Sequence, residues 1–386
     1  MCDSNSLGMS VPGFEAIKSA ALRLATNLRG WKSRRKLMIV ESDDWGAIRM
    51  PGPEAWKRLL KAGIRVDRSR YDSLDCLEKQ EDFQALMNVI GGHRDVSGRP
   101  AIFTFNTVMG NPDFEAIERD GFERFHHQHL FESYRHYHGE DLESDWRQAM
   151  ASGFIRPQFH SREHLNVPLW MRDLKSGLRE TRLAFAESFY GLTTKTSSSR
   201  QINYLAALWA ESKVDLDLVL NNLADGLRLF HETFGYDSRT FVACNYILPN
   251  HAQPVLKANG VDLLQGQRGQ FVPTGEGPGG RVRRAFTGQR IQNGLLCSVR
   301  NVMFEPFEDE SRDWVDSALK EISQSFSLKR PAIISSHRVN YVSGMNQKHR
   351  DRSLRLLDLL LHKVRDRWPG IEFVTSDELL GEMVAN

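Results

Sequence analysis

The alternation of short apolar runs with segments of helical period constrains the fold of this chain more than any other feature. Eight runs are rich in aliphatic, β-branched or aromatic residues, as buried strands are. Between many of them, apolar residues return every three or four positions, which is typical of helices. Strands that alternate with helices indicate a parallel sheet. The runs are residues 37–41, 101–107, 154–159, 240–247, 261–264, 295–304, 332–335 and 371–375, and the clearest helical segments are 54–62, 82–90, 314–326 and 350–364.

The number of these units predicts an α/β barrel. Seven or eight strand–helix units fit a closed or partly open (β/α) barrel better than a doubly wound sheet, and no Gly-x-Gly-x-x-Gly or Walker loop follows an early strand. With 386 residues, 40% of them hydrophobic, the chain is long enough for one large domain or two medium domains. We predict one distorted barrel over residues 37–386, with helical insertions around 111–150 and 168–237. Residues 266–289, rich in Gly and Arg, are expected to form a long irregular surface loop.

Charge and cysteine usage narrow the function classes. The 51 Lys and Arg residues nearly balance the 49 Asp and Glu residues, so no global field attracts nucleic acid. The four cysteines are scattered without CxxC spacing, which favours a reducing compartment over a disulfide framework. No signal-peptide pattern and no apolar run of about 18 residues is found. We therefore expect a cytoplasmic protein.

Residues 1–36 are predicted to form a separate amphipathic helical segment. Its apolar residues fall on one helical face, and cationic residues lie around and after that face. Packing of this helix on the main domain is the favoured interpretation. The alternative is a peripheral contact with an anionic membrane surface through residues 14–36. The apolar residues are Phe14, Ile17, Ala21, Leu24, Leu28 and Trp31.

Two adjacent carboxylates, Asp43 and Asp44, end the first predicted strand. Barrel active sites lie at this carboxyl end of the strands. Because consecutive residues of an extended strand point in opposite directions, one aspartate could bind a metal while the other handles a proton. Alone, the pair is more typical of an ordinary turn.

A pair of histidines, His160 and His164, directly follows the predicted strand 154–159. In a helical turn, the spacing of four directs both imidazoles to one point. Catalytic zinc takes three protein ligands from His and Asp or Glu and leaves one position for water, so Asp44 would complete the set. Two histidines and one carboxylate also describe the iron oxygenase triad, although the carboxylate-first order and the α/β pattern oppose it.

His337 ends the predicted strand 332–335 and its polar extension. Histidines on strands are usually structural. At a barrel rim, however, His337 would face the same mouth as the two aspartates and could serve as a general acid.

The order of these motifs resembles the polysaccharide deacetylases, the NodB-homology group that includes carbohydrate esterase family four. The resembling elements are Asp43-Asp44, His160-Ser161-x-x-His164, Ile334-Ser335-Ser336-His337 and the ending Phe373 to Leu379. The resemblance implies a distorted (β/α) barrel that hydrolyses an N-acetyl or O-acetyl group of a carbohydrate or amino sugar. It also implies that Asp44, His160 and His164 bind a divalent metal, with Asp43 as general base and His337 as general acid. Zinc is the expected metal, and Co²⁺, Ni²⁺, Mn²⁺ and Fe²⁺ suit the same ligands.

The chain departs from this family after the fourth predicted strand, where an Arg and a Pro-aromatic pair are usual. Arg239 and Tyr246 are the candidates there, and Tyr246 could place an oxyanion-binding backbone group. The acidic element that tunes the catalytic histidine is not found near residues 261–271. Trp45, in place of the commoner Gly, is expected to wall the pocket or stack on a sugar, and Asn106 is expected to reach the pocket.

Besides the iron oxygenase, two other functions compete with a deacetylase. A glycosidase needs a second acidic strand end, which is not obvious. A barrel that lost turnover could instead bind glycan or a partner protein. The histidines of the first insertion could hold a second metal, although a solvated polar segment is favoured. These histidines are His126, His127, His129, His136 and His138.

Overall fold

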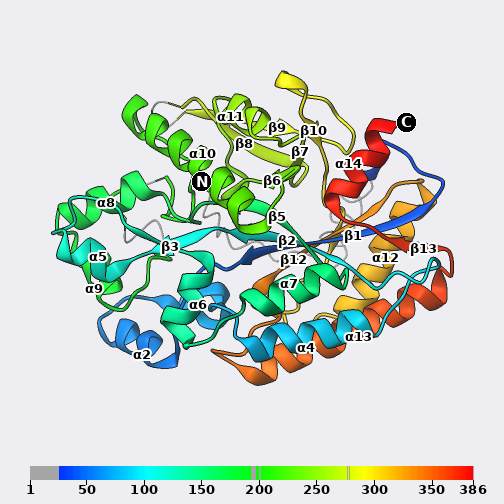
Figure 1. Ribbon diagram of the computed structural model, residues 1–386, viewed down its shortest axis with the longest axis horizontal. Coiled ribbons are helices and arrows are strands. Elements are labelled where there is room, and N and C mark those ends of the chain that lie inside the picture. The colour runs from blue at the N-terminus through cyan, green and yellow to red at the C-terminus, as the bar shows by residue number, and fades with distance from the viewer. Residues whose placement is uncertain (1–25, 193–196, 200, 276, 278, 386) are drawn as a thin grey trace, which may run out of the picture.

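A curled parallel sheet forms the centre of the molecule in the computed structural model (Figure 1), which describes residues 26–192, 197–199, 201–275, 277 and 279–385. In these residues the sheet has nine strands in the order β10-β7-β6-β5-β2-β1-β12-β11, and β13 pairs with β1 outside this path. Neighbouring strands run parallel. The strands are β1 (Lys36–Trp45), β2 (Phe103–Val108), β5 (Ile155–Ser161), β6 (Thr240–Val242), β7 (Leu263–Gln265), β10 (Leu296–Cys297), β11 (Val302–Met303), β12 (Ala332–His337) and β13 (Ile371–Phe373).

The two edges of the sheet lie close together. Only residues 298–301 separate β10 from β11 along the chain, so the two strand ends lie at most about 18 Å apart. No pairing between β10 and β11 occurs among the residues described above. The sheet therefore forms an incompletely closed barrel, which confirms the predicted fold class.

Strand β1 lies between β2 and β12 in the sheet. Its apolar residues are therefore buried on both faces. Met38 and Val40 belong to the main core, whereas Leu37 and Ile39 belong to a second, smaller cluster. Leu379 and Met383 of α14 (Ser376–Ala385) join this smaller cluster. Since residues of one parity share a face of the strand, Glu41 and Asp43 follow Leu37 and Ile39 toward the barrel interior.

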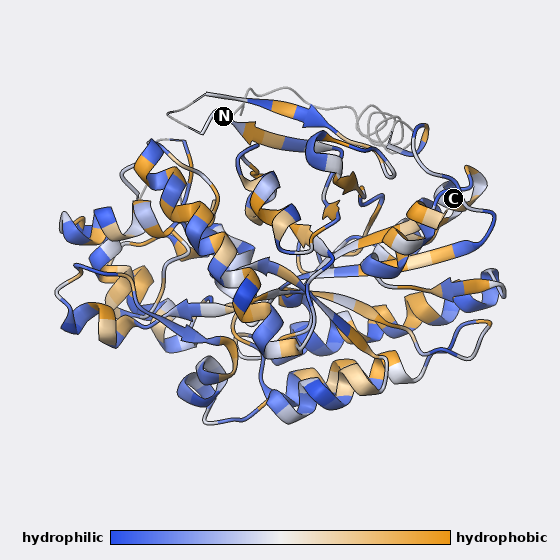
Figure 2. Ribbon diagram, turned by 45° about the horizontal axis from the view of Figure 1, so that its top comes forward, coloured by the Kyte–Doolittle hydropathy of each residue, from blue (hydrophilic) through white to orange (hydrophobic). Residues whose placement is uncertain are grey.

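Helices cover the outside of the sheet (Figures 1 and 2). In the longer ones, buried apolar residues recur every three or four positions, as in Leu354, Leu357 and Leu361 of α13. Helix α10 begins at the N-cap Ser212 and ends before Gly235, whose φ of 77° suits a C-terminal glycine. The outer helices are α4 (Gln80–Gly91), α7 (Glu143–Ala151), α10 (Lys213–Phe234), α11 (Ala252–Ala258), α12 (Trp314–Ser327) and α13 (Gln347–Arg367). Two short helices, α2 (Pro53–Lys61) and α3 (Arg70–Leu74), lie in the connection between β1 and α4.

Both expected insertions contain helices. The first insertion, around residues 111–150, contains α5, α6 and α7 and a small antiparallel pair of strands that begins at Gly110. In the second, around residues 168–237, the helices are α8, α9 and α10. The new elements are β3 (Gly110–Pro112), β4 (His127–His129), α5 (Phe114–Arg119), α6 (Leu130–His138), α8 (Val167–Lys175) and α9 (Arg179–Ala186).

The prediction of an irregular loop over residues 266–289 was wrong. Strands β8 (Gly269–Pro273) and β9 (Gly280–Arg284) form an antiparallel hairpin there. Glycines and arginines hid its strand pattern, because the exposed β9 carries few apolar residues. Cross-strand contacts hold it, including a hydrogen bond that Arg283 donates to Gln270.

The predicted N-terminal helix lies mostly outside the described residues. Of its apolar face, Leu28 is exposed, whereas Trp31 packs against the smaller core cluster. Arg330 donates hydrogen bonds to the carbonyl oxygens of Asn27, Leu28 and Trp31, which holds this segment against the domain. Across the described part of the chain, every helix is too short or too polar to cross a membrane.

Candidate active site

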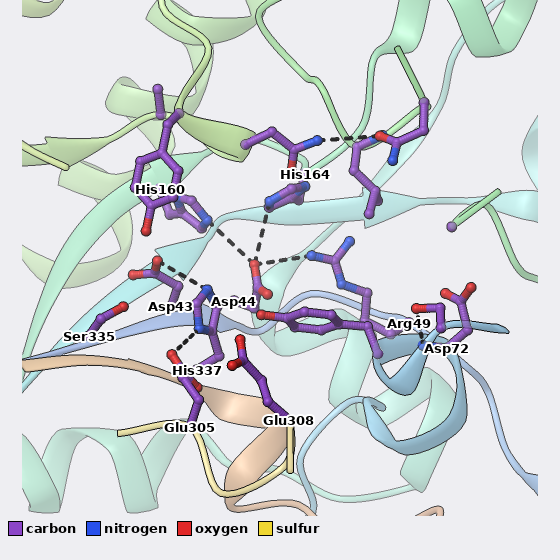
Figure 3. Close-up of a pocket in the computed structure, with 18 of the residues that line it drawn as sticks. Asp43, Asp44, Arg49, Asp72, His160, His164, Glu305, Glu308, Ser335 and His337 are labelled. Atoms are coloured by element: carbon purple, nitrogen blue, oxygen red, sulfur yellow. Dashed lines mark hydrogen bonds and ion pairs between the residues drawn. The ribbon is translucent and has the colours of Figure 1, made fainter. Parts of the chain in front are cut away.

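A cavity of about 400 Å³ opens at the carboxyl ends of β1, β5 and β12 (Figure 3). It brings together all five residues predicted to carry the chemistry. Asp43 and Asp44 come from β1, His160 from β5, His164 from the following turn and His337 from β12.

Asp44 and the two histidines converge on one point. The Oδ1 atom of Asp44 lies 3.4 Å from Nε2 of His160 and 3.5 Å from Nε2 of His164. This oxygen is buried and lies 3.0 Å from Nη2 of Arg49, but no contact with it among the described residues has the geometry of a hydrogen bond. Nδ1 of His160 lies 2.8 Å from the carbonyl oxygen of Val242, so Nδ1 carries the proton and Nε2 keeps its lone pair.

These three side chains fit a divalent metal. Burial, followed by the charge of Arg49, holds the pKa of His164 well below its usual value, so the ring is neutral as a metal ligand must be. Burial by itself would raise the pKa of Asp44, but the charge of Arg49, the largest opposing cause, holds this pKa well below its usual value. A carboxylate and two imidazoles that converge on one point form a three-ligand set of the kind that catalytic zinc uses.

Backbone irregularity turns both aspartates toward the cavity. Strict alternation would point Asp43 and Asp44 in opposite directions. Instead, Asp44 adopts a φ of 75°, and the register between β1 and β2 shifts between Ser42 and Trp45. This bulge lets two consecutive carboxylates line the same cavity.

Asp43 is held by a buried arginine that the sequence did not single out. Arg300 donates from Nη1 to Oδ2 and from Nη2 to Oδ1 of Asp43, both at 2.7 Å, and from Nε to Glu41 at 2.7 Å. Asn106 donates a further hydrogen bond of 2.7 Å to Asp43 Oδ1. Burial alone would raise the pKa of Asp43, but the charge and hydrogen bonds of Arg300 lower it to about 2. Asp43 is therefore a carboxylate at any physiological pH.

His337 faces Asp43 and is held from behind by Glu305. Its Nε2 lies 3.6 Å from Oδ2 of Asp43, and its Nδ1 lies 2.6 Å from Oε1 of Glu305. Asn340 donates to the other oxygen of Glu305 at 2.8 Å. Burial by itself would lower the pKa of His337, but the charge and hydrogen bond of Glu305 raise it to about 9. His337 is therefore a protonated acid at neutral pH.

Of the four predicted substrate contacts, only Tyr246 lines the cavity. Its hydroxyl accepts a hydrogen bond of 3.1 Å from Arg300. Trp45 is 1% exposed and stacks on Phe105, and Asn106 is buried behind Asp43. Arg239 lies at the surface, 2.7 Å from Asp262. The geometry thus gives Trp45, Asn106 and Arg239 structural contacts rather than places in the cavity wall.

Several polar residues at the site were not predicted: Arg49, Asp72, Cys244, Arg300 and Glu305. Arg300 and Glu305 lie in and just after residues 295–304, which the sequence pattern predicted as one strand. Burial raises the pKa of Asp72, which also lines the cavity, to about 7. The sulfur of Cys244 and one ring nitrogen each of His160 and His164 lie within 4.8 Å of one another. No sequence signal distinguishes these residues from ordinary core or surface residues. Cys244 lies within one expected strand, Arg300 lies within another, and Glu305 directly follows the second.

The histidines of the first insertion form ordinary polar contacts. His126 lies 2.9 Å from Asp120, and Nε2 of His129 lies 2.7 Å from the hydroxyl of Thr233. In the described ranges, none of the five joins a metal-sized group of donors. A second metal site gains no support from this geometry.

The sequence matches no protein-family profile and no curated protein. Among solved structures, the chain is similar to 4-α-glucanotransferase from Thermococcus litoralis, at 10% identity and a TM-score of 0.43, over 90% of this chain and 40% of the other. It is also similar to a Mycobacterium smegmatis protein described as a polysaccharide deacetylase, at 12% identity and a TM-score of 0.41, over 92% and 93% of the two chains. A family 4 acetyl xylan esterase from Clostridium thermocellum, in complex with a cobalt ion, matches at 12% identity and a TM-score of 0.34, over 90% and 91%. All three TM-scores lie below 0.5.

Proposed function

We propose that this protein is a metal-dependent hydrolase that removes an N-acetyl or O-acetyl group from a carbohydrate or amino sugar. One observation carries the proposal: a ligand set of Asp44, His160 and His164 lies beside an acid–base pair, Asp43 and His337, in a single cavity. The three ligands alone would be consistent with a site that only binds a metal. The adjoining base and acid provide what hydrolysis of an acyl bond requires in addition.

Asp44, His160 and His164 would hold the metal. A bound divalent metal would polarise the acyl oxygen and lower the pKa of a water molecule, toward ~7 in the best zinc cases. That contribution is needed here, because a carboxylate whose pKa is about 2 is a weak base toward ordinary water.

Asp43 and His337 carry the protons. Asp43 accepts the proton of the attacking water through its carboxylate, which Arg300 and Asn106 keep in place. Nε2 of His337 donates its proton to the departing nitrogen or oxygen, while Glu305 stabilises the imidazolium. At neutral pH both groups are in the required state at once, because the pKa of Asp43 is about 2 and that of His337 is about 9.

The cavity wall supports a polyhydroxyl substrate. It includes hydroxyl and amide side chains that can accept and donate hydrogen bonds, together with the Tyr246 ring. The polar side chains are Ser69, Asn203, Asn245 and Gln267.

One contact favours a second candidate, a binding protein without turnover. Nη2 of Arg49 lies 3.0 Å from Oδ1 of Asp44, so an arginine contacts the oxygen that the metal would use. If the guanidinium excluded every metal, the cavity would still bind a glycan but would not hydrolyse it.

Elemental analysis and acetate release test the proposal together. We expect close to one equivalent of metal in the wild type, and loss of metal in both Asp44→Ala and His160→Ala. Acetate release from N-acetylated sugars should be lost in parallel. Arg239→Ala is the matched control, since this arginine pairs with Asp262 at the surface and should keep metal and activity. A folded wild type that takes up no metal after reconstitution would contradict the hydrolase and favour the binding protein.

A further inference from the structure

Arg49 is a buried arginine in the cavity wall that the proposed reaction does not use (Figure 3). Only 8% of its surface is exposed. Its Nη2 lies 3.0 Å from Oδ1 of Asp44, and its Nε lies 3.4 Å from Oδ2 of Asp75. Its Nη1 is buried and has no hydrogen-bond partner among the described residues. The guanidinium is therefore held at the metal ligands rather than in solvent.

The guanidinium and a metal would share one oxygen atom. Zinc lies about 2.0 to 2.2 Å from a carboxylate oxygen, and Nη2 of Arg49 lies 3.0 Å from Oδ1 of Asp44. The two positive charges would therefore lie within about 5 Å of each other, a separation at which buried charges interact strongly.

Arg49 has little freedom to move away. Asp75, its second partner, also binds Arg338 at 3.0 Å, and Arg338 in turn binds Glu78 at 2.8 Å. Both acidic residues and Arg338 are fully buried. Asp72 is a third carboxyl group near Arg49, and it also lines the cavity; burial raises the pKa of Asp72, and the charge of Arg49 acts against this rise. This network holds the positive charge beside the site whether or not Asp44 binds a metal.

We propose that Arg49 is a positioning residue that competes with the metal for Asp44 and so weakens the metal affinity of the site. The proposal rests on the metal site of the proposed function and assigns this arginine a role in it. Only metals that bind the histidine nitrogens strongly would overcome the competition, so Arg49 would also help to exclude Mg²⁺ and Ca²⁺, which prefer oxygen ligands.

Zinc affinity, measured by competition with a chromophoric chelator, tests this role. Arg49→Met removes the charge and should tighten zinc binding about tenfold or more, whereas Arg49→Lys keeps the charge and should stay near the wild type. Arg49→Gln is a second neutral variant with a polar group. The matched control is Arg350→Met, which removes a buried arginine of the outer helix α13 that pairs with Asp82 of α4 and with Asp351. We expect its zinc affinity to be unchanged.

Thermal unfolding in EDTA gives an independent measurement. Without Arg49, the buried Asp44 loses its cation, so Arg49→Met should melt at a lower temperature than the wild type in EDTA. Added zinc should raise its melting temperature by more than it raises that of the wild type.

The direction of the change distinguishes competition from a merely structural role. If Arg49 only supported the fold, both neutral variants would bind zinc more weakly. Unchanged or weaker binding by a folded neutral variant would overturn the inference and leave the proposed function intact. If the wild type bound no divalent metal at all, the proposed function would fail. Uptake of zinc by a neutral variant alone would then support the competition, and no uptake by any variant would overturn it.

Discussion

His337 depends on a carboxylate that lies 32 residues away in sequence and follows the neighbouring strand. Glu305 follows β11, whereas His337 ends the adjacent strand β12, and their side chains meet at 2.6 Å. An imidazole in this buried position would lose its proton more easily than in water without the carboxylate. The charge of Glu305 therefore decides whether His337 is an acid at neutral pH.

Glu305→Gln should move the alkaline limb of the activity profile to lower pH. The pKa of His337 is raised to about 9, so the protonated acid persists below that pH and is lost as pH rises through it. Removing the carboxylate leaves burial to lower this pKa, and we expect the limb in kcat/KM to fall by at least about one pH unit. The control Glu310→Gln changes an exposed glutamate that pairs with Arg70. If the alkaline limb were unchanged in Glu305→Gln, the group that loses its proton there would not be His337.

At the scale of elements, the sequence predicted strands better than their interruptions. Strands β1, β2, β5 and β12 were found because their apolar runs are continuous and buried. Residues 295–304 were predicted as one strand, but they form β10 and β11 with a turn that carries Arg300. Residues 240–247 leave the strand after Val242, and Asn245 and Tyr246 adopt φ near 50°. Hydropathy reports burial rather than φ, so it could not show where these strands break.

The packing of α10 on β5 requires a glycine close to His160, at Gly226. A Cβ atom at Gly226 would lie 2.7 Å from Cβ of Arg162 and 2.8 Å from the ring tip of Phe159. We expect Gly226→Ala to reduce the free energy of unfolding by about 1 to 2 kcal/mol, because overpacking outweighs the gain in helix propensity. Urea unfolding measures this change. Gly381→Ala is the matched helical control, since nothing lies within 4 Å of its Cβ position, and it should stabilise by about 0.5 to 1 kcal/mol. Equal effects of the two substitutions would contradict the close packing.

At the scale of the whole molecule, the sequence predicted which polar residues meet in the cavity but not the residues that support them. Asp43, Asp44, His160, His164 and His337 end or directly follow apolar strands, and parallel strands bring their carboxyl ends to one rim. Arg300 reaches Asp43 across 257 residues of chain. Such a contact depends on where the curled sheet brings its edges together, and no local pattern encodes that closure.

The helical insertion over residues 168–237 should unfold together with the barrel. Its Leu174 and Tyr204 belong to the same buried cluster as Val40 and Phe103 of the central strands. Asn166 also links the rim to the insertion, by accepting from Leu169 N at 3.0 Å and donating to the carbonyl oxygens of Ala206 and Trp209. Separating the two parts would expose this shared apolar surface, at a cost of about 25 cal/mol for each Å². Calorimetry should therefore record one transition whose van't Hoff and calorimetric enthalpies agree. A separate, earlier transition that Leu174→Ala shifts and Phe103→Ala does not would instead identify the insertion as an independent domain.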